Sequence, residues 1–192
     1  MRLSEFCLAI AALLGTCKAA PAGPIRDSIP APSNLIPGSI QIAEGVWYSN
    51  RTGNASVTDL GHELAAQISH CRVEDSTYEN QGSGGSPYAK DCWVLHDNIV
   101  GDGDWTVTLL DQHQIAQHGS CAFGVTYWGN LGGEPYFLVG NDDVRRIVSR
   151  SIELFMFHGN GADRVGTKGR MYCRPGDRPV EWGLYWNPGF SG

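Results

Sequence analysis

Ser86-Pro87-Tyr88-Ala89-Lys90-Asp91-Cys92 begins the segment whose pattern decides the fold. Ser86 is a favourable helix N-cap, and Pro87 suits the first helical position, where its missing N–H costs nothing. The apolar residues of this segment fall at i, i+4, i+7 and i+11, which is one face of a helix: Tyr88, Cys92, Leu95 and Ile99. The pattern predicts a helix that ends at Gly101-Asp102-Gly103-Asp104.

A second helix is predicted to begin at Asn141, which can act as its N-cap. Asp142 and Asp143 follow in the first turn, where the helix dipole favours negative charge. Its apolar residues form a stripe at helical spacing: Val144, Ile147, Val148, Ile152 and Phe155. Gly159 ends the helix.

Strand patterns surround these two helices. Trp105-Thr106-Val107-Thr108-Leu109 alternates strictly, as a half-buried strand does. Further strands are predicted at residues 121–127, 136–139, 170–174 and 180–186. The order of helix, strands, helix and strands predicts an α+β fold, in which both helices cover one face of an antiparallel sheet.

The N-terminus is typical of a secretory signal peptide, residues 1–19. Arg2 supplies the positive charge, Cys7 to Leu14 form a short apolar run, and Cys17-Lys18-Ala19 closes it with small residues. The run is shorter than the roughly 20 residues that a membrane-spanning helix needs. We therefore expect a secreted, extracellular protein without a transmembrane segment.

The rest of the chain divides by composition. Residues 20–45 are rich in Pro, Ala, Ser and Gly and are predicted to be a flexible arm or pro-segment. Residues 46–70 are predicted to be a surface segment, because Asn50-Arg51-Thr52 and Asn54-Ala55-Ser56 are both N-glycosylation acceptors. Residues 71–188 are predicted to form the folded domain.

Removal of the leader would also remove Cys7 and Cys17. It leaves an even set of cysteines: Cys71, Cys92, Cys121 and Cys173. In an exported chain such a set predicts two disulfides, and the wide spacings do not suit a zinc site. We expect Cys92 to pair with Cys121, since they lie on the inward faces of a helix and a strand, and Cys71 to pair with Cys173.

No motif in the sequence has the residue spacing of a known catalytic or metal-binding site. His62-Glu63 lacks the second histidine of a zinc protease, and Gly82-Ser83-Gly84-Gly85-Ser86 is not preceded by a strand. A glycosidase needs two carboxylates roughly 5 to 10 Å apart, and spacing selects no pair among the four candidates, Asp111, Glu134, Glu153 and Glu181. Asp102 and Asp104 lack the pattern of a calcium loop. We expect no catalysis, no metal and no cofactor.

The charge of the chain and the placement of its aromatic residues indicate which classes of partner it can bind. The formal net charge is −6, and the basic cluster Arg145, Arg146 and Arg150 lies on the polar side of the second helix, so we expect no nucleic-acid partner. The aromatic residues on or near predicted strands are Trp128, Trp182, Tyr185 and Trp186. Alternation places Trp182 and Trp186 in the core and points Tyr185 away from it.

Several distinctive segments on, between and after the cysteines follow one another in a fixed order. They comprise Ser86 to Val107, His118-Gly119-Ser120-Cys121-Ala122-Phe123-Gly124-Val125, Val139 to Val144, Val165 to Cys173, and Trp182-Gly183-Leu184-Tyr185. Read together, these segments resemble the Hce domain family of fungal secreted effectors, the necrosis-inducing factors. The resemblance covers roughly Cys71 to Tyr185.

The resemblance implies a secreted virulence or necrosis-inducing effector with a disulfide-braced α/β sandwich like that of fungal killer toxins. It implies a non-enzymatic protein, expected to be a monomer, that binds an unknown host or competitor molecule, a protein or a glycan. A killer-toxin-like channel blocker and a secreted hydrolase of cell-wall glycans are the alternatives.

Overall fold

The computed structural model describes residues 39–43, 46–50, 68–108, 111–129 and 136–191. Two α-helices lie in this part of the chain, α1 (Ala89–Asn98) and α2 (Asn141–Phe155), together with a 3-10 turn, η2 (Val73–Asp75). None of the helices among the described residues is long and apolar enough to cross a membrane.

The described strands form two antiparallel sheets and a hairpin. The five-stranded sheet has the order β3 (Glu79–Asn80), β10 (Thr167–Cys173), β11 (Arg178–Trp186), β6 (Cys121–Tyr127) and β5 (Gln112–His118). The four-stranded sheet has the order β1 (Ile40–Ala43), β2 (Val46–Asn50), β4 (Gly103–Thr108) and β7 (Tyr136–Gly140). β8 (Phe157–Gly159) and β9 (Ala162–Arg164) pair only with each other.

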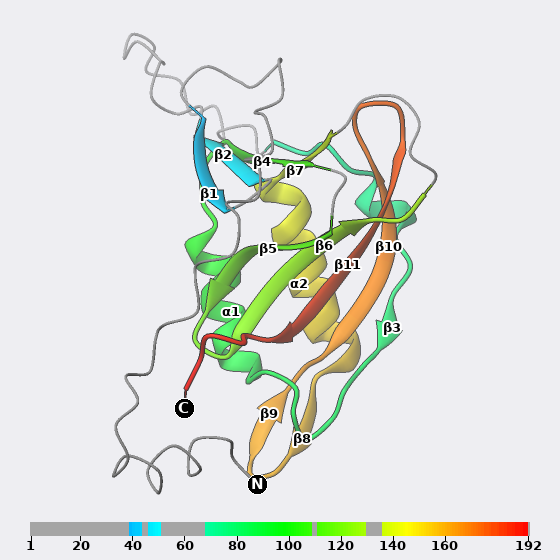
Figure 1. Ribbon diagram of the computed structural model, residues 1–192. Helices are drawn as coiled ribbons and strands as arrows, with labels where there is room; N and C mark the ends of the chain where they lie inside the picture. Colours follow the sequence, from blue (N-terminus) through cyan, green and yellow to red (C-terminus); the bar gives the residue numbers. More distant parts are fainter. Residues whose placement is uncertain (1–38, 44–45, 51–67, 109–110, 130–135, 192) are drawn as a thin grey trace, which may run out of the picture.

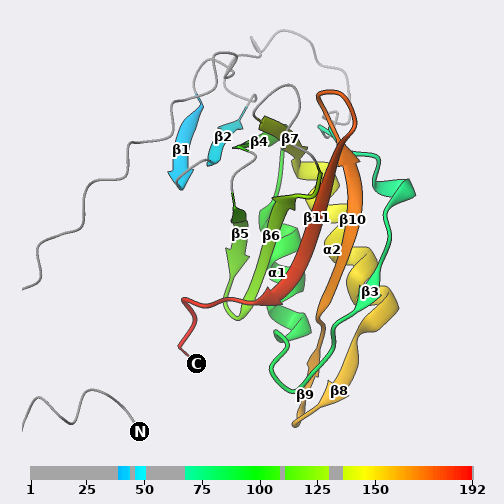
Figure 2. The ribbon, with the colours of Figure 1, turned by 45° about the vertical axis from the view of Figure 1, so that its right-hand side comes forward.

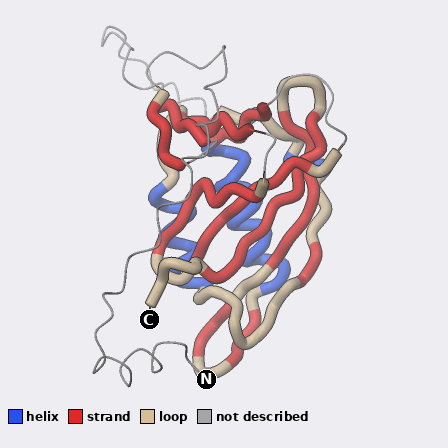
Figure 3. Tube along the Cα trace, viewed as in Figure 1, coloured by secondary structure: helices blue, strands red, loops and turns tan. Residues whose placement is uncertain are grey.

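Both helices lie behind the five-stranded sheet (Figures 1 and 3), and the four-stranded sheet lies across one end of this layer (Figure 2). The core between helices and sheet contains Leu95 and Ile147 from the helices and Phe123, Trp182 and Leu184 from the strands, all at most 2 % exposed. The Thr167 hydroxyl also donates to the Ser151 hydroxyl at 2.9 Å, which joins β10 to α2 inside the core. The expected disulfide-braced α+β fold with two helices and antiparallel strands is confirmed, although the strands divide between two sheets.

The helix starts differ from the expectation. α1 is capped by Tyr88 rather than Ser86, whose hydroxyl instead accepts the backbone N–H of Ser83 at 2.9 Å. α2 already includes Asn141, and its N-cap is Gly140. The Asp143 side chain, three residues after Gly140, accepts the backbone N–H of Gly140 at 2.8 Å. The Asn141 side chain does not cap α2, because its amide donates instead to Val100 O at 3.0 Å and to Gly101 O at 3.1 Å.

The segment before residue 71 also differs from the expectation. β2 pairs along its length with β4, from Val46 opposite Val107 to Asn50 opposite Gly103, and Val46 and Trp47 are buried. Residues 46–50 therefore belong to the folded body instead of a surface segment ahead of it, and part of the 20–45 arm forms β1. The backbone hydrogen bonds of β2 are made with β4, which is distant in sequence, so the local composition of residues 46–50 does not predict them. The signal segment 1–19 and Asn54 lie outside the described residues.

Two disulfides hold the layers together. Cys92 of α1 is bonded to Cys121 of β6, and Cys71 is bonded to Cys173 at the end of β10. The bridges close loops of 29 and 102 residues, for which the loop-entropy model gives stabilisation of roughly 3.6 and 4.7 kcal/mol. The first clamps a helix to the sheet, and the second fixes the start of the domain to its penultimate strand.

Candidate functional site

The face of the five-stranded sheet that points away from α1 and α2 is the most distinctive surface of the described chain. Within the described residues no helix covers it (Figure 1). We call it the open face, and its outward residues are Gln112, Gln114, Gly124, Thr126, Lys168, Arg170, Tyr172, Pro179, Glu181, Gly183 and Tyr185, with Trp128 directly after β6. These residues are outward because their neighbours along each strand form the core, and strand side chains alternate between faces.

Tyr185 lies flat across the open face. A Cβ atom built on Gly124 would be 2.5 Å from the Tyr185 hydroxyl and 3.0 Å from its ring carbon Cε1, so the ring occupies the space above this glycine. Gly183 is the register partner of Gly124 and also carries no side chain. The Tyr185 hydroxyl donates to Gln114 Oε1 at 3.5 Å, and burial raises the pKa of Tyr185 above its ordinary value. Tyr185 therefore presents a protonated phenol ring that lies along the sheet.

A second aromatic group lies at the other end of the same face. Trp128 is 48 % exposed, and its backbone N–H donates to Pro179 O at 2.8 Å. The guanidinium carbon of Arg170 lies 3.7 Å from the centroid of the Trp128 ring, and Arg170 Nε lies 3.6 Å from Glu181 Oε2. The stack and the ion pair together hold Arg170 in place, because a cation above an indole face is favourable even at an exposed site.

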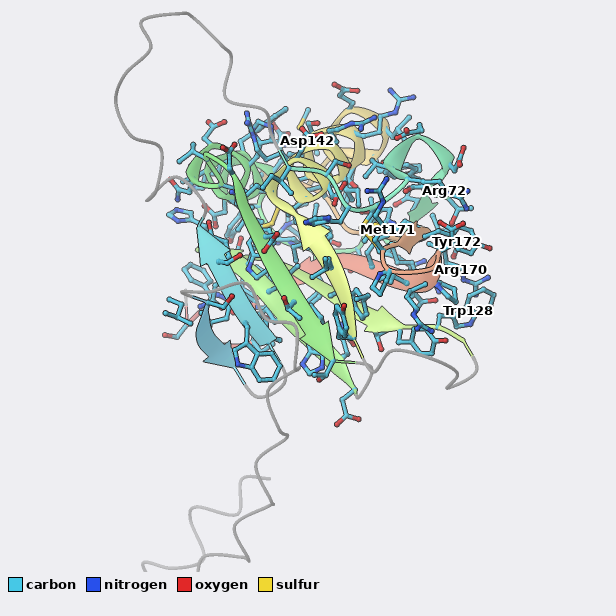
Figure 4. All side chains as sticks on the ribbon, turned by 90° about the horizontal axis from the view of Figure 1, so that it is seen from above. Arg72, Trp128, Asp142, Arg170, Met171 and Tyr172 are labelled. Atoms are coloured by element: carbon cyan, nitrogen blue, oxygen red, sulfur yellow. A yellow bond between two sulfur atoms is a disulfide. The ribbon has the colours of Figure 1, made fainter. Side chains whose placement is uncertain are left out.

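The edge of this face continues as a row of cations and rings. Arg72 lies over the Tyr172 ring, 5.1 Å from its centroid, in the same manner as Arg170 over Trp128. Figure 4 shows Arg72, Tyr172, Arg170 and Trp128 following one another along one edge of the molecule. The neighbouring Met171 points the other way, into the core, with 1 % exposure.

This arrangement has the chemistry of a surface for an amphipathic ligand with flat faces. Exposed aromatic rings offer apolar area with little conformational entropy to lose, which is why they are common in binding sites. Amide, guanidinium and carboxylate groups beside the rings can donate and accept hydrogen bonds. A sugar ring matches both properties, since its C–H faces are apolar and its edge carries hydroxyl groups.

A charged hollow of the described surface lies on the helix side. It has a volume of about 320 Å³ and is lined in part by Glu74, Tyr78, Arg146, Arg150 and Glu153. Each carboxylate there is paired with an arginine, Glu74 with Arg146 at 3.4 Å and Glu153 with Arg150 at 3.1 Å. Burial raises the pKa of Tyr78, partly offset by the two arginines. Because its charges are already paired, the hollow is a weaker candidate for a ligand site.

The four carboxylates singled out in the sequence do not form one cluster. Glu181 lies on the open face, Glu153 lies on α2 behind the sheet, and Glu134 is outside the described residues. Asp111 directly precedes β5, and Gln112 pairs with Thr126, which pairs with Glu181. Two strand spacings therefore separate Asp111 from Glu181, about 10 Å.

Asp104 of the expected polar turn is engaged in the fold. Asp104 is 1 % exposed, accepts from the Ser49 hydroxyl, and lies 3.0 Å from His70 Nε2. Across the described ranges, no group of three or more His, Cys, Asp or Glu residues is arranged to hold a metal ion. Asp104 therefore joins β4 to β2 and to the His70 segment.

Sequence reasoning placed Tyr185 correctly on the outward side but did not find the open face as a unit. Alternation made no assignment for Trp128, and the structure leaves nearly half of this side chain exposed. The alternation of Lys168, Arg170 and Tyr172 along β10 was the available signal, since three polar or aromatic residues at period two mark an exposed side.

Comparison with known proteins adds a family and two relatives. The profile of the Hce2 family, described as "Pathogen effector; putative necrosis-inducing factor", matches residues 70–173. The chain is 33% identical over 148 residues to "Probable chitinase LysM18" of Penicillium expansum, covering 76% of this chain and 10% of that protein. It is 32% identical over 122 residues to "Secreted chitinase LysM12" of the same organism, covering 61% of this chain and 8% of that protein.

The chain thus spans about a tenth of the length of these curated relatives. The expectation of a non-enzymatic protein is contradicted by their names, since both are called chitinases. That expectation was based on local motifs alone. Catalytic groups that converge only in the folded protein leave no fixed spacing in the sequence, so a search for motifs does not find them.

Proposed function

The chain belongs to the Hce2 family of pathogen effectors, and from this premise we propose that it is a secreted effector domain that binds chitin-type glycan. The glycan would be a β-linked polymer of N-acetylglucosamine. The observation that carries the proposal is the open face, where Tyr185 lies flat over Gly124 and Trp128 stands exposed under Arg170. The names of the two curated relatives support the choice of glycan, and one of those names includes the word secreted.

The binding chemistry follows from the side chains of this face. Tyr185 and Trp128 would stack on the C–H faces of sugar rings. A pair of aromatic rings contributes about 0.5–1.5 kcal/mol, and we take this as the scale for each contact. Gln112 and Gln114 would donate and accept hydrogen bonds at one side of the ligand, and Arg170 and Glu181 at the other. Since Arg170 and Glu181 already neutralise each other, the face suits an uncharged polymer.

Co-sedimentation of the purified protein with insoluble chitin tests the proposal. Wild type should be found with the chitin, and Tyr185→Ala and Trp128→Ala should each shift protein to the supernatant. Trp93→Ala is the matched control, because Trp93 is a comparably exposed indole, at 39 %, on α1 behind the sheet. Loss of binding in the Trp93 variant with full binding in the other two would place the site elsewhere and refute the proposal.

A second candidate function is hydrolysis of the same glycan, and the names of the relatives favour it. Asp111 directly precedes Gln112, whose backbone lies about two strand spacings from that of Glu181, so the two carboxylates are the candidate pair at this sheet. Release of soluble sugar from chitin oligomers by wild type, lost in Glu181→Gln and in Asp111→Asn while binding persists, would establish hydrolysis. Absence of product from the wild-type protein would reject it.

A further inference from the structure

The residues between Tyr185 and Trp128 form a flat floor with polar side chains on both sides. Gly124 and Gly183 are paired in register and together carry no side chain, while Ala122, opposite Tyr185, contributes only a methyl group. The Tyr185 ring fills the space that these small residues leave, because it lies over Gly124 and beside Gly183. A flat ligand therefore meets the ring here and not the glycine backbone.

Two register rows across the sheet end in polar groups on both sides. One row runs from Gln114 through the two glycines to Lys168, and the next runs from Gln112 through Thr126 and Glu181 to Arg170. The amides belong to β5 and the cations to β10, so they line the floor on opposite sides. Hydrogen-bonding groups thus flank the floor along its length.

The length of the floor follows from the register. Trp128 N–H is bonded to Pro179 O, so Trp128 lies level with Pro179, six residues from Tyr185 along β11. At about 3.3 Å per residue the backbone positions of the two residues are roughly 20 Å apart. The Tyr185 ring lies over Gly124, which is level with Gly183, so the ring is roughly 13 Å from the level of Trp128. A single sugar ring is much shorter than this span, so no monosaccharide can contact both aromatic groups.

We propose that the open face is a track for an extended, uncharged glycan chain that runs along β11 and contacts Tyr185 and Trp128 together. This inference rests on the proposed function and adds the form of the ligand: several consecutive sugar units instead of one terminal sugar. Each added unit gains contacts on the floor without a new cost of association, so affinity rises with length until both rings are covered.

Calorimetric titration with N-acetylglucosamine oligomers of increasing length tests the track. In wild type the dissociation constant should fall by about 2- to 13-fold between the dimer and an oligomer that spans the floor, which is the equivalent of one further aromatic contact. Trp128→Ala should bind the dimer and the long oligomer with nearly the same affinity. Binding in wild type that does not vary with length would refute the track and leave the proposed function intact, whereas no binding of any oligomer would refute both.

Two glycine variants distinguish an effect of the Tyr185 ring position on binding from a general effect on folding. Gly124→Ala would bring a methyl group within 2.5 Å of the Tyr185 hydroxyl and force the ring off the floor, whereas at Gly183 the new atom would lie 3.4 Å from that ring, in ordinary contact. We expect Gly124→Ala to weaken binding of the long oligomer about tenfold and Gly183→Ala to leave it within about threefold. Equal affinities in the two variants, with unchanged circular dichroism, would contradict the role of Tyr185 as a flat platform.

Discussion

The carboxylate of Asp143 accepts the backbone N–H of Cys71 at 3.1 Å, across 72 residues of sequence. The same oxygen, Oδ2, also accepts the N–H groups of His70 and Gly140, each at 2.8 Å, while Oδ1 accepts the Ser69 hydroxyl. One fully buried side chain therefore accepts the backbone N–H at the N-cap of α2 and also holds the segment that leads into the Cys71–Cys173 disulfide.

Replacement of Asp143 by alanine should strongly destabilise the fold. Three buried N–H groups would lose their acceptor, and each unsatisfied buried group costs about 1–3 kcal/mol, so we expect a loss of at least roughly 3 kcal/mol. Asp143→Asn should cost much less, because its amide oxygen can accept the same N–H groups and its NH₂ can donate to Ser69. Urea unfolding of the two variants measures the difference, and equal losses would show that the hydrogen bonds are not the cause.

The same residue predicts a pH dependence. Burial raises the pKa of Asp143 above its ordinary value of 3.8, although four hydrogen bonds oppose this effect. A carboxyl group whose pKa is higher in the folded state contributes its stability fully below pH 3.8 and loses it as the pH rises through the folded value. The unfolding free energy of wild type relative to Asp143→Asn, which does not titrate, should therefore decrease as the pH is raised from 3.5. An increase over this range would contradict the direction of the shift.

The two disulfides should contribute unequally to stability. Because the Cys71–Cys173 bridge closes the longer loop, Cys71→Ser/Cys173→Ser should lose about 1 kcal/mol more than Cys92→Ser/Cys121→Ser. Guanidinium unfolding under non-reducing conditions gives both values. Peptide mapping without reduction provides the control, and a Cys71–Cys92 peptide would overturn both pairs.

Glycosylation at the end of β2 or just beyond it remains a prediction of the sequence. Asn50 is the last residue of β2, and Asn54 follows four positions later. Protein from its native secretor should lose apparent mass on treatment with an N-glycosidase, because the two acceptors lie in a chain that is predicted to carry a secretory leader. The double variant Asn50→Gln/Asn54→Gln should show no such change. An unchanged mobility of the wild-type protein would count against occupancy at either site.

The effector action should depend on the open face if glycan binding underlies it. Infiltration of purified protein into leaves of a responsive plant should cause cell death with wild type and Trp93→Ala, and much less with Tyr185→Ala. Circular dichroism of the three proteins checks that each is folded. Full activity of a folded Tyr185→Ala protein would separate the effector action from this surface.

Local pattern was sufficient for several parts of the structure. The stripe of Val144, Ile147, Val148 and Ile152 predicts α2 because helix periodicity is set by the backbone, and all four side chains are buried. Alternation in β11 likewise places Trp182 in the core and Tyr185 outside it. The four cysteines of the bridges were also identified by their number and the secretory leader.

Tertiary structure decided what local pattern could not. β2 becomes a buried strand only because β4 pairs with it, and Asp143 becomes a cap for two segments only because the chain brings Cys71 to the start of α2. The open face is the same kind of feature, since Gly124, Tyr185 and Trp128 come together only through the register of β6 with β11. The sequence by itself determined which residues face inward along each element, because that depends on backbone period. Which elements became neighbours, and hence where a ligand could bind, depended on long-range pairing that leaves no local signal.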